Sequence, residues 1–99
     1  MSFDNIENYT NLVSEIDKKY GIKRDASLTF IQLLEEVGEL AKEINKPNLR
    51  HSEIDRENLK GEFADVFLQL LTLAKLLEVN LPEALDDKIK ILKKRHDLS

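Results

Sequence analysis

Apolar residues recur at helical spacing along most of the chain, and no segment shows the sustained alternation typical of a half-buried strand. A first amphipathic segment covers residues 6–20, and Gly21 supplies the left-handed residue that often ends a helix. A second begins at Asp25 or Ser27, since either side chain can accept a hydrogen bond from the free amides of a first turn. It continues to Ile44.

Two more helices are predicted in the second half of the chain. Residues 48–52 indicate a loop, and Ser52 with Asp55 three positions later resembles a capping arrangement that starts a helix running to about Glu78. Pro82 fits the first turn of the last helix, whose acidic residues lead and whose basic residues trail. We therefore expect an all-α fold of four helices with short connections, forming one domain over residues 1–99.

The third predicted helix is apolar on almost every side, so it belongs in the middle of a structure. Three short neighbours do not easily cover so much apolar circumference. We expect part of this helix, or of the second, to pack against another subunit, most simply across a twofold axis, so that oligomerisation completes a helical bundle. A tightly packed monomer is the alternative.

One narrow polar stripe interrupts the apolar surface of this helix, and it consists of Glu62, Asp65, Gln69 and Thr72. Carboxylates held among packed leucines are costly to bury without compensation. Glu62 and Asp65 therefore need a cation, a network of hydrogen-bond donors or a water-filled cleft.

A second pair of acids, Glu36 and Glu39, has the same three-residue spacing on the second predicted helix. Residues three apart on a helix project from the same side, so two facing pairs would supply four oxygen ligands for one small site. Mg²⁺ prefers such ligands and completes its shell with water and phosphate, whereas zinc prefers the histidine and cysteine that are missing nearby. The alternative for either pair alone is a solvated acidic face.

Composition narrows the classes of function. The chain has 99 residues and a net charge of −4, so it offers no overall basic field for a nucleic-acid partner. The absence of cysteine excludes disulfides, thiolate metal sites and cysteine nucleophiles. No basic segment followed by an apolar run opens the chain, and polar residues interrupt its longest apolar stretch. We expect no secretory signal, no membrane partner and a cytoplasmic location.

A four-carboxylate site repels an anionic triphosphate unless a metal inverts the local charge. A carboxylate not used as a ligand, from Glu35, Glu36 or Glu39, could orient or deprotonate an attacking water. Basic residues of the last helix could hold phosphate oxygens, although a solvated basic last turn is equally consistent with them. These residues are Lys88, Lys93, Lys94 and Arg95.

The chain resembles the MazG-like family of all-α nucleoside triphosphate pyrophosphohydrolases, whose signature is EExxE followed by ExxD. The resemblance covers about residues 27–95 and rests on EEVGELAKEI and on GEFADVFLQLLTLAKLLEVNLPEALDDKIKILKKR. Five acids match the signature position for position: Glu35, Glu36, Glu39, Glu62 and Asp65. Phosphoribosyl-ATP pyrophosphohydrolases share the scaffold and acid pattern, but the NLPEAL connection fits the MazG-like branch better.

The resemblance implies Mg²⁺ as cofactor, with Mn²⁺ as a substitute, and hydrolysis of a nucleoside triphosphate to the monophosphate and pyrophosphate, as in clearing unwanted nucleotides. It also implies an oligomer built on dimers and phosphate contacts from the last helix, for which Lys88 and Arg95 are the best matches. Two other functions remain open. One is a helical nucleotide-binding or dimerisation module without turnover, and the other is a plain helical interaction protein.

Overall fold

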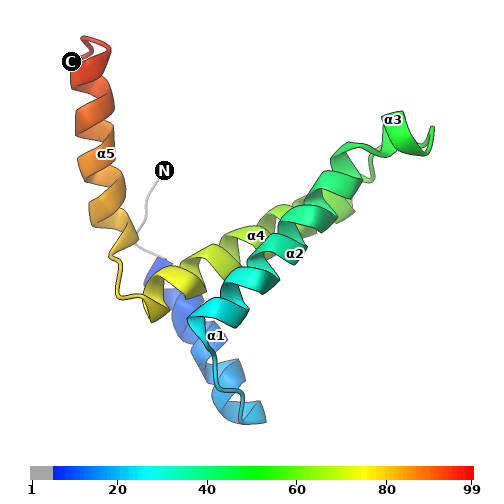
Figure 1. The fold of residues 1–99 in the computed structure, drawn as a ribbon, viewed down its shortest axis with the longest axis horizontal. Coiled ribbons are helices and arrows are strands. Elements are labelled where there is room, and N and C mark those ends of the chain that lie inside the picture. The colour runs from blue at the N-terminus through cyan, green and yellow to red at the C-terminus, as the bar shows by residue number, and fades with distance from the viewer. Residues whose placement is uncertain (1–5) are drawn as a thin grey trace.

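A computed structural model describes residues 6–99, and every regular element within that range is a helix (Figure 1). The all-α prediction is confirmed, and the first five residues of the predicted domain lie outside the described range. The elements are α1 (Ile6–Tyr20), α2 (Ala26–Ile44), α3 (Lys46–Leu49), α4 (Arg56–Leu76) and α5 (Leu81–Arg95).

The predicted boundaries of α1, α2 and α5 are largely confirmed by their end residues. Gly21 adopts a φ of +66° directly after α1, a left-handed conformation in which a side chain would be strained. Asp25 caps α2 by accepting a hydrogen bond of 3.0 Å from the amide of Leu28. Asn80 caps α5 in the same way, and Pro82 lies in its first turn as expected.

The connection between α2 and α4 differs from the prediction at two points. Part of the expected loop forms the one-turn helix α3, and α4 begins later than Ser52. The reason is that the Asp55 carboxylate itself caps α4, accepting hydrogen bonds from the amides of Glu57 and Asn58 at 3.0 and 3.2 Å. At its other end α4 stops at Leu76, and Glu78 takes the left-handed conformation with a φ of 57°.

α2 and α4 run antiparallel and side by side, and we call this pair the hairpin (Figure 1). α1 packs across α4 at the end where α4 leads into α5. α5 projects away from the hairpin, and only its first turn comes near another helix, where Leu81 and Pro82 share a hollow with Ile6 and Thr10. The centre of the chain is therefore a two-helix unit.

We call the line along which α2 and α4 face each other the seam. On each helix the seam consists of residues of low exposure at helical spacing. On α2 these are Thr29, Leu33, Glu36, Leu40 and Glu43, and on α4 they are Leu59, Glu62, Val66, Gln69 and Leu73. Carboxylates are thus part of the packing contact itself.

One residue after most of the seam positions, both helices carry large apolar side chains that the chain leaves uncovered. Because the helices are antiparallel and both stripes are displaced in the same direction from the seam, they lie on the same side of the hairpin. We call this side the apolar face. It includes Phe30, Leu34 and Val37 of α2 and Phe63, Phe67 and Leu70 of α4, each 42 to 55% exposed.

The chain is much more open than a compact protein of its size. It exposes 8020 Å² of surface, whereas a compact monomer of 11.5 kDa exposes about 5,800 Å². Its radius of gyration is 16.6 Å, against about 13 Å for a globular chain of this length. The apolar face and the separate position of α5 account for this openness.

Glu43 ties the end of α2 to both α3 and the start of α4. Its buried carboxylate lies 2.9 Å from Lys46 Nζ and accepts a hydrogen bond of 3.1 Å from the amide of Asp55. The hydrogen bond from Lys46, helped by the Asp55 amide, holds the pKa of Glu43 below its usual range, although burial opposes the shift. This contact fixes where the chain turns between the two helices of the hairpin.

We predict that Glu43→Gln lowers the thermal unfolding midpoint at neutral pH and weakens its pH dependence. Because the pKa of Glu43 is lowered in the folded protein, its stabilisation is present above the unfolded value of 4.5 and is lost as pH falls through the folded value. Thermal melts from neutral pH to about pH 3 measure this difference. Glu57→Gln, which removes an exposed pair with Lys60, is the control, and equal effects of both variants would contradict the assignment.

Candidate metal centre

Three carboxylates converge midway along the hairpin. Glu36 of α2 and Glu62 of α4 occupy facing seam positions, and Asp65 lies one turn after Glu62. One carboxylate oxygen from each residue lies within 4.8 Å of those of the other two. Of the four ligands that the sequence predicts, the structure brings Glu36, Glu62 and Asp65 together, and Glu39 is not part of this group.

The cluster is electrostatically strained. Burial, followed by the negative charges of Asp65 and Glu62, raises the pKa of Glu36 above its usual range. Glu39 and Glu35 add to the same shift. A positive charge placed among these oxygens would relieve the repulsion, so the arrangement favours binding of a cation.

Two buried oxygen atoms at the cluster have no hydrogen-bond partner among the described residues. They are Glu62 Oε2 and, two turns along the same helix, Gln69 Oε1. An orphaned acceptor in a packed seam is unfavourable unless a donor, a water or a cation reaches it. The donor set consists of hard carboxylate oxygens, which suit Mg²⁺ or Mn²⁺.

The other two acids of the predicted site lie at the rim. Glu39 is on the turn after Glu36, is about half exposed, and forms an ion pair of 3.3 Å with Lys42. Glu35 is exposed beside Glu36. Glu35, Glu39 and Asp65 each precede a seam position by one residue, so they lie on the side of the hairpin opposite the apolar face. The acids therefore open onto their own face.

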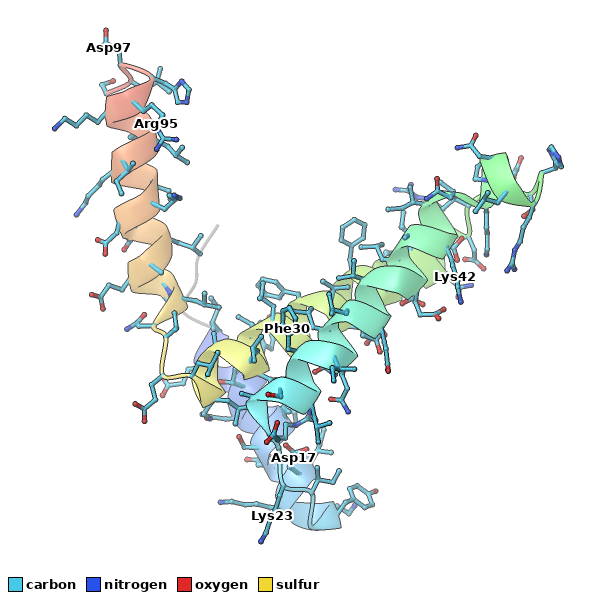
Figure 2. All side chains as sticks on the ribbon, viewed as in Figure 1. Asp17, Lys23, Phe30, Lys42, Arg95 and Asp97 are labelled. Atoms are coloured by element: carbon cyan, nitrogen blue, oxygen red, sulfur yellow. The ribbon has the colours of Figure 1, made fainter. Side chains whose placement is uncertain are left out.

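The predicted phosphate ligands are not brought to the acids within one chain. Lys88 lies on the exposed part of α5, and Arg95 lies at the far end of that helix, well away from the hairpin (Figure 2). Any contact of these two residues with a ligand at the acids would need α5 from a second copy.

A cavity of about 220 Å³ opens beside the acids, and it contains a residue that the sequence analysis missed. Glu36, Asp65, Gln69 and Thr72 line it together with Arg24 from the connection between α1 and α2. Gln69 and Thr72 belong to the predicted polar stripe. Arg24 carries no periodic or motif signal, because it lies in the short segment after Gly21, whose path only the fold defines.

Comparison with models of known protein families gives a match, which covers most of the chain. Residues 25–98 match the model of the MazG nucleotide pyrophosphohydrolase domain, and the chain therefore belongs to this family. The match includes α2, α4 and α5 and all five acids of the predicted signature. No curated protein matches the chain closely enough to be counted as a relative. Among residues 6–99, no helix combines the length and the apolar character needed to cross a membrane.

We predict that Glu36→Gln stabilises the metal-free protein at neutral pH and abolishes its stabilisation by Mg²⁺. A carboxyl group whose folded pKa is raised destabilises the fold increasingly as pH rises above its unfolded pKa, and glutamine removes this penalty. In the wild type, Mg²⁺ at about 100 times its Kd should add about 2.7 kcal/mol to the free energy of unfolding.

Thermal melts with EDTA and with Mg²⁺ measure both effects. Glu57→Gln, on an exposed turn of α4, serves as the control and should respond to Mg²⁺ like the wild type. A Glu36→Gln protein that is still stabilised by Mg²⁺ would contradict the proposed ligand.

Proposed function

We propose that the chain is a Mg²⁺-dependent nucleoside triphosphate pyrophosphohydrolase that converts a ribo- or deoxynucleoside triphosphate and water into the monophosphate and pyrophosphate. The observation that carries this proposal is the convergence of Glu36, Glu62 and Asp65 from two helices. Membership of the MazG family supports the same class of reaction. A role in clearing unwanted nucleotides in the cytoplasm belongs to the proposal.

The acids divide into two roles. Glu36, Glu62 and Asp65, joined by Glu39 from the rim, would hold the metal. Bound there, Mg²⁺ would offset the negative charge of the phosphates and bring them to the carboxylates. The exposed Glu35, or whichever of Glu36 and Glu39 is not engaged as a ligand, would accept a proton from the attacking water.

The proposed reaction is the hydrolysis of a phosphoanhydride. The water oxygen bonds to phosphorus as the anhydride between the α and β phosphates breaks, and the water proton passes to a carboxylate and then to solvent. Lys88 and Arg95 would bind phosphate oxygens if α5 of a second copy reaches the acids.

Product analysis by ion-exchange chromatography tests the function, using each common ribo- and deoxynucleoside triphosphate with Mg²⁺. We expect equal amounts of monophosphate and pyrophosphate from the wild type, and a rate lower by roughly a hundredfold or more for Glu62→Ala, because a metal ligand is lost. Replacing Mg²⁺ by Mn²⁺ should retain activity.

Glu57→Ala is the matched control, because Glu57 lies on the same helix but is exposed and outside the cluster. Inorganic phosphate as a product would contradict cleavage between the α and β phosphates. Tight binding of nucleotides without turnover would instead favour a nucleotide-binding module.

We further infer that the chain forms a homodimer or a dimer of dimers through the apolar face. The chain exposes about 2,200 Å² more surface than a compact monomer of its mass, which is enough for a stable interface between subunits. A second hairpin laid on the apolar face would cover both rows of aromatic and aliphatic side chains and leave the acid side open. This arrangement agrees with the predicted bundle completed by oligomerisation.

Phe67→Glu should convert the oligomer into monomers, because a carboxylate at the centre of an apolar contact is costly to desolvate. Phe67 is 45% exposed in the single chain, so the chain itself should stay helical. Light scattering coupled to size-exclusion chromatography gives the mass, and circular dichroism checks the helices. Leu49→Glu, at an exposed residue of α3 outside the apolar face, is the control, and a Phe67→Glu protein with the wild-type mass would disprove the interface.

A further inference from the structure

The cavity beside the acids is one end of a longer groove. A hollow of about 400 Å³ lies between α1 and α4, and it shares Val13, Arg24 and Thr72 with the cavity of about 220 Å³ at the metal centre. We call the two together the α1–α4 groove. It leads from Glu36 and Asp65 at one end, past Arg24, to the last turns of α1 and α4.

Charge changes along this groove. The end at the metal centre is acidic, whereas the larger hollow carries three cations, Lys18, Arg24 and Lys75, against two carboxylates, Asp17 and Glu78. The groove thus places metal-binding acids next to a series of cations. A complementary ligand would bind the metal through some of its phosphate oxygens and the cations through its other phosphate oxygens. A chain of linked phosphates has this form.

Arg24 is held in place by Asp17, which is buried in α1. Its Nε and Nη2 donate hydrogen bonds of 2.6 and 3.1 Å to the two oxygens of the Asp17 carboxylate. A guanidinium has five N–H groups, so three lie outside this pair, and Nη1 makes only a marginal contact of 3.5 Å with Gln32. Arg24 is therefore oriented in advance and retains donors that suit phosphate oxygens.

Lys75 adds a second cation, which, unlike Arg24, forms no ion pair with a carboxylate within the described part of the chain. Its ammonium lies 3.2 Å from Asn11 Oδ1 and 3.4 Å from Ser14 Oγ, which are uncharged acceptors. Neither Lys75 nor Lys18 forms an ion pair with a carboxylate of residues 6–99. Both retain their charge for an anionic ligand.

We propose that the α1–α4 groove binds the outer two phosphates of the substrate, which leave as pyrophosphate, with Arg24 as their main ligand, Lys75 as a second and Asp17 as the residue that positions Arg24. This inference rests on the proposed function and assigns a part of the substrate to a part of the chain. It also gives a single chain its own cationic subsite, independent of α5.

Binding of inorganic pyrophosphate in the presence of Mg²⁺, measured by calorimetry, tests the groove without requiring turnover. Arg24→Gln should weaken pyrophosphate binding about tenfold or more, because it removes a charge-assisted pair of hydrogen bonds. Lys75→Gln should weaken it less. Binding of nucleoside monophosphates and of Mg²⁺ alone should stay at the wild-type level in both variants.

A test of Asp17 must distinguish loss of its positioning of Arg24 from general destabilisation of the fold. Asp17→Asn should weaken pyrophosphate binding while leaving monophosphate binding intact, and Asp17→Glu should restore part of the loss. Arg24→Gln leaves Asp17 unpaired and could be unstable for that reason. In that case two other variants test the groove: the double variant that combines Asp17→Asn with Arg24→Gln, and the single variant Lys75→Gln. Lys60→Gln, a lysine of α4 outside the groove, is the control for loss of a positive charge.

The outcomes separate this inference from the proposed function. If the wild type hydrolyses nucleotides but Arg24→Gln and Lys75→Gln bind pyrophosphate as tightly as the wild type, the subsite is disproved and the proposed function is not. Pyrophosphate binding that depends on Arg24 without hydrolysis of any nucleotide would support the groove and overturn the function. Failure of the wild type to bind pyrophosphate, or equal weakening of pyrophosphate and monophosphate by Arg24→Gln, would also overturn the subsite.

Discussion

The central constraint on this structure is that two carboxylates take part in packing α2 against α4. Glu36 and Glu62 occupy seam positions where leucine or valine would stabilise the hairpin more, and Asp65 brings a third negative charge within reach. Burial and then the neighbouring negative charges raise the pKa of Glu36, and Glu62 Oε2 is buried without a hydrogen-bond donor. Like-charge clusters of this kind are typical of sites where chemistry, rather than stability, determines the residue.

Neighbouring positions along the two helices of the hairpin lie on surfaces with different properties. The seam positions carry the inner acids, and most of the positions that follow them form the apolar face. The outer acids Glu35, Glu39 and Asp65 precede seam positions. Two helices thereby present an association surface on one side and a charged site on the other. Since helical geometry couples the two sides, a rotation of either helix would disturb both of them.

Most of the secondary structure and the acid cluster were accessible from the sequence because each depends on local spacing. The caps at Asp25 and Gly21 and the pairs on α2 and α4 follow from short-range rules. The start of α4 was placed too early, because Asp55 caps the helix and Glu43, twelve residues away, accepts a hydrogen bond from the Asp55 amide. Arg24 was missed for a similar reason, since only the packing of α1 on α4 brings it beside the acids.

The face of α2 that meets α4 also could not be read from the pattern. The widest apolar arc of α2 suggests the side that packs within the chain, yet Phe30, Leu34 and Val37 stay half exposed while Glu36 and Glu43 enter the seam. An apolar arc shows only that a side is to be covered, and it does not distinguish a neighbour in the same chain from one in another chain. Glu36 and Glu43, by contrast, lie on the side that the chain covers itself.

The short connection across α3 has a consequence for how the protein is made. It joins the two helices that carry the clustered acids, so those acids meet across two neighbouring long helices of one chain. Bringing two such helices together closes a shorter loop than pairing segments from opposite ends of the chain, and it needs no second molecule. The clustered acids are therefore brought together by one chain alone, and their meeting does not require the second molecule that would cover the apolar face.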